Sequence, residues 1–214
     1  MFAGRGGRGT APAFPAEFRA RSILEFLVVL GSPEAGDRGA TLTGAAERGA
    51  WGTRWRTERD AENGTGMLYH LCSGASGIGT FLIRLWRATG EDTLRAPAEE
   101  AATAVHRART VTGTAVCHGL AGNGDFQLDM DQAPGGPYRA MAGDLAVVRY
   151  ARRTLRDGRA LVPDDSGTGV TVDCGVGPAG AVSFLLRMRK GGPRPLLDDA
   201  GEPAQATAFE GVPA

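Results

Sequence analysis

Three stretches of the chain repeat one pattern: CSGASGIGTF at residues 72–81, CHGLAGNGDF at residues 117–126 and GVGPAGAVSF at residues 175–184. In each stretch two glycines stand three residues apart, and a phenylalanine follows the second glycine after four residues. The first glycines are separated by 45 residues (74 to 119) and by 58 residues (119 to 177), a spacing typical of helical-hairpin repeats. A glycine-rich composition does not place phenylalanine at one offset three times. The middle of the chain is therefore an internal repeat.

Each copy of the pattern predicts the start of a helix. Glycine permits a sharp loop and close packing, and apolar residues follow at helical spacing, as do Phe81 and Leu85 in the first copy. Two further helices are expected over about residues 97–108 and 137–155, with Asp157 and Gly158 ending the second. Alternating helices of this kind curve into a solenoid or a closed ring. The sequence thus predicts an all-α fold, a partial α/α toroid of helical hairpins with glycine-rich loops opening the inner helices.

The flanks of the repeat region are expected to have less structure. Residues 1–13 are rich in glycine, arginine and proline and are predicted to be disordered, as is the tail at residues 194–214. Residues 14–65 are expected to be a poorly defined helical segment with one helix over about residues 16–30. Trp51 and Trp55 are the only large anchors that follow it in this segment. The repeats themselves lie within residues 66–193.

Composition excludes several classes of protein. The chain has 24 Lys and Arg and 24 Asp and Glu, so no net charge draws it to nucleic acid or anionic lipid. The apolar run at residues 23–30 contains Glu25 and is too short to span a bilayer, and no convincing cleavage site for a signal peptide follows. Three cysteines do not make a disulfide framework, and at least one thiol stays free. A reducing, cytoplasmic location is expected.

Two cysteines and a histidine stand at matching places in successive copies. Cys72 occupies the position in the first copy that Cys117 occupies in the second, and His118 follows Cys117. Equivalent loops of a ring meet at one end, so these side chains are expected to converge. Two thiolates and an imidazole leave a fourth tetrahedral position open, as in catalytic zinc sites. A second interpretation stays open, because a cysteine ahead of a helix is often a small buried apolar residue.

Several other polar residues near the repeats are interpreted without a metal. Cys174 has no histidine beside it and is taken as a structural thiol. His70 is expected on a loop surface, with a supporting or acid–base role beside the metal as the alternative. His106 is expected to be solvated on an outer helix. Asp125 is interpreted as compensating a helix dipole, and Asp129 is expected to be exposed.

The paired motifs Cys72-x-Gly-x-x-Gly and Cys117-His-Gly-x-x-Gly resemble the lanthionine synthetase C-like family, in particular the C-terminal cyclase region of synthetases that fuse lyase, kinase and cyclase. The resemblance covers residues 66–193 well and residues 40–65 weakly. It implies a toroid of seven hairpins with a zinc ion held by Cys72, Cys117 and His118. It also implies a cyclase that activates peptide cysteine thiols for addition to dehydroalanine or dehydrobutyrine, which forms thioether rings. The implied substrate is a dehydrated precursor peptide.

One departure from the family concerns acid–base chemistry. Family members carry an acid–base histidine in a loop ahead of the first zinc cysteine, whereas residues 1–69 contain no histidine. The chain is therefore expected to be about half of a complete cyclase domain, and no catalytic residue is assigned. A separate lyase and kinase chain, or a front-half cyclase chain, is a candidate partner. The alternative function is a non-catalytic remnant that binds zinc, a small thiol or a peptide.

Overall fold

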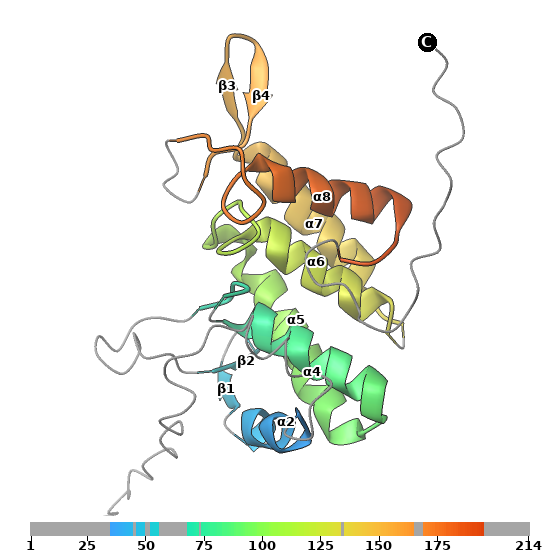
Figure 1. Ribbon diagram of the computed structural model, residues 1–214. Helices are drawn as coiled ribbons and strands as arrows, with labels where there is room; N and C mark the ends of the chain where they lie inside the picture. The colour runs from blue at the N-terminus through green and yellow to red at the C-terminus, as the bar shows by residue number, and fades with distance from the viewer. Residues whose placement is uncertain are drawn as a thin grey trace, which may run out of the picture.

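The computed structural model describes residues 35–44, 46–49, 52–55, 68–72, 74–133, 135–164 and 169–194 of the 214-residue chain. This part is mostly helical, which confirms the all-α class (Figure 1). The helix predicted over residues 16–30, the predicted disordered N-terminus and Trp51 lie outside the described residues. Within these ranges, the structure contains no helix whose length and apolar character would suffice to cross a membrane.

All three repeat copies begin a helix, as predicted. Each helix starts directly after the first glycine of its copy, and that glycine is the N-cap residue in all three cases. The helices are α4 (Ala75–Thr89), α6 (Leu120–Asp131) and α8 (Pro178–Lys190). Helix α6 contacts both α4 and α8, so the three repeat helices form one stacked row (Figure 1).

Two further helices cover this row. Helix α5 (Arg95–Arg107) follows the short 3-10 helix η2 (Asp92–Leu94), precedes η3 (Ala108–Thr110) and packs on α4. Helix α7 (Tyr138–Ala151) packs on α6. The residues of α6 are buried from its start through Met130, whereas α7 buries one stripe, namely Tyr138, Ala142, Leu145 and Arg149. Inner helices α4 and α6 are therefore largely buried, whereas outer helix α7 and the last inner helix, α8, bury only part of their surface. Closure of the row into a ring stays a prediction.

The repeated phenylalanine and a glycine of the preceding copy fit each other. A Cβ atom on Gly79 of α4 would lie 2.3 Å from the ring of Phe126 on α6, and a Cβ on Gly124 of α6 would lie 2.3 Å from the ring of Phe184 on α8. Gly79 and Gly124 occupy the same position in their copies, and both phenylalanine rings are fully buried. Each ring thus lies on the bare backbone of the copy before it. In the third copy this position is the exposed Val182, where the described row ends.

The segment ahead of the repeats contains more than helix. Helix α2 (Ala35–Gly44) is followed by strands β1 (Glu47–Gly49) and β2 (Gly52–Arg54), which pair antiparallel. Just after β2, Trp55 is buried, and its indole N–H donates to the carbonyl oxygen of Leu42 at 2.8 Å. The described part of residues 14–65 is thus one helix and a hairpin, anchored by Trp55 as expected.

The second outer helix is shorter than predicted. Helix α7 ends at Ala151, and strands β3 (Thr154–Arg156) and β4 (Arg159–Leu161) follow as an antiparallel pair. Asp157 and Gly158 join them with φ angles of 50° and 71°. A two-residue turn with both φ values positive matches the twist of a hairpin and favours Asp-Gly. The prediction that these two residues end the helix is wrong, because they form a hairpin turn.

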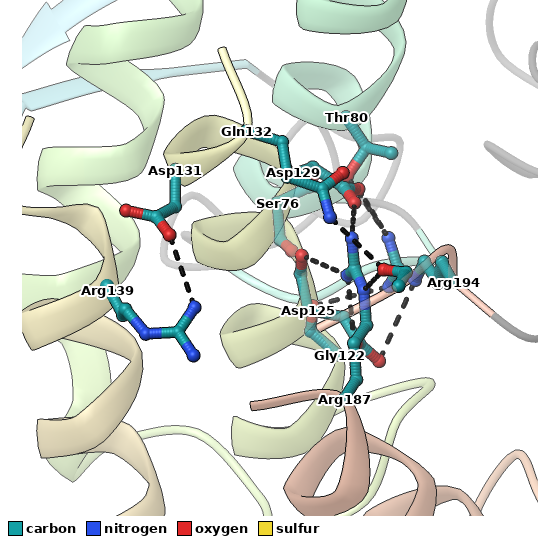
Figure 2. A network of polar contacts seen from close by, with 11 residues as sticks. Ser76, Thr80, Gly122, Asp125, Asp129, Asp131, Gln132, Arg139, Arg187 and Arg194 are labelled. Atoms are coloured by element: carbon teal, nitrogen blue, oxygen red, sulfur yellow. Dashed lines mark hydrogen bonds and ion pairs between the residues drawn. The ribbon is translucent and has the colours of Figure 1, made fainter. Parts of the chain in front are cut away.

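A buried ion-pair network joins the repeat helices (Figure 2). From α8, Arg187 contacts Asp125 at 3.1 Å and Asp129 at 2.5 Å, both on α6. Arg194, which follows α8, lies 3.4 Å from Asp129 and 3.8 Å from Asp125. Arg194 also donates to the carbonyl oxygen of Gly122 at 3.3 Å. Two cations and two anions therefore neutralise each other between α6 and α8.

This network corrects three expectations. Asp129 was expected to be exposed but is 4% exposed, and Asp125 forms ion pairs rather than merely facing a helix dipole. Burial raises the pKa of Asp125, and the positive charges of Arg194 and Arg187 oppose that rise. Arg194 was placed at the start of a disordered tail but is 2% exposed. Arg194 is therefore part of the packed structure, and residues 195–214 of the predicted tail lie outside the described residues.

Candidate metal centre

The structure brings the three predicted ligands together. Cys72 precedes α4, and Cys117 and His118 precede α6, so all three lie in loops that lead into repeat helices. One ligand atom from each residue lies within 4.8 Å of the other two. Among the described residues, no other three His, Cys, Asp or Glu side chains lie close enough together to hold a metal ion. The two cysteines are half-buried and His118 is exposed.

Backbone hydrogen bonds between equivalent loops explain the convergence. The N–H of Cys72 donates to the carbonyl oxygen of Cys117 at 3.3 Å, and the N–H of Cys117 donates to that of Gly175 at 2.8 Å. These three residues occupy the same position in the three copies of the repeat. Each loop is thus bonded to the corresponding loop of the next copy. The register inferred from the sequence is confirmed at this point.

The repeated glycines let each loop fold back on itself. A Cβ atom on Gly74 would lie 2.5 Å from the carbonyl oxygen of Leu68, and one on Gly119 would lie 2.6 Å from that of Gly113. The second glycine of the pattern is equally confined, since a Cβ on Gly122 would lie 1.9 Å from the carbonyl oxygen of Val116. Neither Gly74 nor Gly119 has a positive φ. Close backbone approach, rather than an unusual φ, is therefore why these positions are glycine.

The sulfur atoms of Cys72 and Cys117 are joined as a disulfide. The sequence predicted two separate thiols, and the loop hydrogen bonds explain the difference, because they hold the two Cα atoms 5.7 Å apart, within the reach of a disulfide. Oxidised cysteines cannot act as zinc ligands, since a metal binds the thiolate. In the reduced form the same residues offer two sulfurs and one imidazole, a donor set that suits zinc with one position left open.

The remaining histidines differ from their predicted surroundings. His70 is half-buried, and its ring meets that of His118 edge to face, with the centroids 4.9 Å apart. This places it beside the predicted ligands rather than simply on a loop surface. His106 was expected to be solvated, but its Nε2 donates to a carboxylate oxygen of Asp144 at 2.8 Å. That bond links outer helices α5 and α7, and His106 does not join the cluster.

Cys174 is free, exposed and absent from the metal-ligand group. It occupies the position of Leu71 and Val116 in the earlier copies, one residue ahead of the ligand position. A Cβ atom on Gly180 would lie 2.0 Å from the carbonyl oxygen of Cys174. This matches the close approach of Gly122 to the carbonyl oxygen of Val116 in the second copy. Cys174 therefore contributes its backbone to the loop and does not bring its sulfur to the other two.

The comparison with known proteins agrees with this architecture. A family model described as lanthionine synthetase C-like protein matches residues 45–195, which is more than half of the chain. The match includes β1, β2, all three repeat helices and Arg194. The comparison with curated proteins gave no match. On the strength of the repeat, the loop geometry and this match, the chain belongs to the lanthionine synthetase C-like family.

Proposed function

We propose that this chain is a zinc-dependent cyclase of the lanthionine type, acting on cysteine thiols of a dehydrated precursor peptide. Its zinc ligands would be Cys72, Cys117 and His118. The observation that carries the proposal is the meeting of these three ligand atoms within 4.8 Å, in equivalent loops of a family member. Two sulfurs and an imidazole favour zinc over the harder cations that prefer oxygen ligands.

The chain's own residues prepare the site for a substrate thiol. A bound zinc would supply the charge that keeps such a thiol as a thiolate, the reactive nucleophile, near neutral pH. His118 is exposed and the cysteines are half-buried, so the cluster lies within reach of a peptide in solvent. The backbone bonds from Cys72 to Cys117 and from Cys117 to Gly175 hold both sulfurs in position beforehand. Ligands fixed in this way need little reorganisation when metal or substrate arrives.

Metal content tests the ligand assignment. After reduction with a thiol reagent, which is oxidised to its own disulfide while the Cys72–Cys117 bond becomes two thiols, we expect one zinc per chain. The variant Cys117→Ala should lose it. Cys174→Ala is the matched control, because it removes a thiol from the corresponding loop of the third copy and should keep the metal. A reduced wild-type chain without zinc, or a Cys117→Ala variant that keeps it, would overturn the assignment.

A second candidate is a protein that binds zinc, a small thiol or a peptide without turnover. The observation that favours it is the exposure of His118 beside two half-buried cysteines, an arrangement that would also let zinc hold a small thiol or a peptide cysteine without any reaction. Incubation with a dehydrated, cysteine-containing peptide separates the two functions. Adding a thiol across a double bond leaves the mass unchanged, so cyclisation appears as loss of thiol that can be alkylated. A binder retains the peptide but leaves its thiols free.

A further inference from the structure

The loop of the third repeat copy supports the metal loops although it carries none of the predicted ligands. The carbonyl oxygen of Gly175 accepts two backbone hydrogen bonds from the second loop, from Val116 at 3.1 Å and from Cys117 at 2.8 Å. Cys117 in turn accepts the N–H of Cys72 at 3.3 Å. The orientation of one peptide group at Gly175 is therefore transmitted to both predicted cysteine ligands through consecutive hydrogen bonds.

One side chain holds that peptide group in place. A carboxylate oxygen of Asp173 accepts the N–H groups of Gly175 and Val176, both at 2.7 Å. The other carboxylate oxygen accepts the hydroxyl of Thr171 at 3.2 Å. A carboxylate that accepts consecutive backbone N–H groups stabilises a compact local turn. Hydrogen bonds to a charged acceptor are also stronger than those between neutral groups. Asp173 therefore restricts the loop that presents the Gly175 carbonyl.

We propose that Asp173 is a positioning residue for the metal centre, acting on Cys117 through the carbonyl group of Gly175. The proposal rests on the zinc function proposed above. Asp173 is exposed and does not belong to the ligand cluster, so it would touch neither metal nor substrate.

Zinc affinity of the reduced full chain, measured by competition with a coloured chelator, tests the proposal. Supporting residues around metal ligands typically contribute about 10- to 100-fold in affinity, and we expect Asp173→Ala to lose about tenfold. Asp173→Asn keeps one oxygen that can accept the same N–H groups and should retain part of that affinity. Asp157→Asn removes an equal charge from another exposed position, in the turn between β3 and β4, and should leave the affinity unchanged.

Two further measurements separate positioning from general stability. The Co²⁺-substituted protein should show altered thiolate absorption in Asp173→Ala, since the cysteine geometry changes. In the metal-free reduced protein, amide exchange at Val116 and Cys117 should become faster in Asp173→Ala while exchange within α6 stays as in wild type. Unchanged affinity, absorption and exchange in Asp173→Ala would overturn the proposal.

The exchange measurement also distinguishes the two proposals from each other. If the reduced wild-type chain bound no zinc, the proposed function would fail. Faster exchange at Cys117 would then still support Asp173 as the residue that orders this loop, and unchanged exchange would overturn that as well.

Discussion

Replacing Gly124 with alanine tests the packing that defines the repeat. Gly124 lies inside α6, and a Cβ there would approach the ring of Phe184 to 2.3, 2.4 and 3.0 Å at three carbon atoms. That ring is fully buried and cannot swing into solvent. Forcing an extra carbon into a filled core costs about 1–3 kcal/mol. Alanine in place of a helical glycine recovers about 0.5–1 kcal/mol, so a net destabilisation of up to about 2.5 kcal/mol is expected.

Gly143 of α7 provides the matched control. It is also a helical glycine, but no heavy atom lies within 4 Å of the position a Cβ would take. Gly143→Ala should therefore stabilise the protein by about 0.5–1 kcal/mol through helix propensity alone. The difference between the two variants isolates the steric cost, about 1–3 kcal/mol.

Urea unfolding of the reduced chain measures both variants, with thermal midpoints as a check. For a domain of this size, 1 kcal/mol corresponds to about 2–4 °C. Adding Phe184→Leu to Gly124→Ala should cost less than Phe184→Leu costs in the wild type, since the smaller side chain relieves the clash. If Gly124→Ala stabilises the chain as much as Gly143→Ala does, the packing of phenylalanine on glycine is not what constrains this position.

The remaining predictions concern charges. Arg187→Ala leaves Asp125 and Asp129 buried with one cation fewer and should lower the free energy of unfolding in urea by about 3–5 kcal/mol. Arg139→Ala breaks a more exposed ion pair and should lower it by less than about 1 kcal/mol. Similar losses in the two variants would contradict a buried network. The N–H of Val176 above all holds the pKa of Asp173 below its ordinary value, aided by the Thr171 hydroxyl and the N–H of Gly175. Because this pKa is lowered in the folded chain, the ionised carboxylate stabilises the fold at pH values above the ordinary pKa of aspartate. That stabilisation is lost as the pH falls through the lowered pKa. Acid titration of stability should thus be shallower for Asp173→Asn than for wild type, and equal slopes would argue against this carboxylate's contribution.

Helix starts and ligand positions could be predicted because both follow from local spacing. A glycine pair and a phenylalanine at constant offsets identify equivalent residues without any knowledge of distance. Once Cys72, Cys117 and Gly175 were aligned, their proximity followed from the rule that equivalent loops of stacked repeats lie side by side. The backbone hydrogen bonds between these three residues confirm that alignment.

The burial of charge could not be predicted in the same way. Asp125 and Asp129 are one helical turn apart, a pattern that equally describes an exposed acidic face. Their partner Arg187 is 62 and 58 residues away along the chain, and Arg194 lies beyond the predicted end of the ordered region. Only the packing of α8 and its following segment on α6 brings these charges together.

The Asp-Gly turn shows the same limit at short range. Asp157-Gly158 is compatible with the end of a helix and with a hairpin turn, and the pairing of β3 with β4 selects the hairpin. Asp173 carried no sequence signal beyond its place ahead of a loop. It stands four residues ahead of its repeat glycine, where the other copies have His70 and Ala115, and an aspartate there can accept the backbone N–H groups that follow it.

The repeat, the helix starts and the three residues that meet at the candidate metal centre can be read from the sequence, because they depend on spacing along the chain and on glycine at points of close backbone approach. How the copies fit together follows from their packing in three dimensions. This packing placed Phe126 and Phe184 on the glycines of neighbouring helices, buried two aspartates against two arginines, and brought the sulfurs of Cys72 and Cys117 into bonding contact. Those outcomes depend on distances between segments far apart in sequence, which local spacing does not encode.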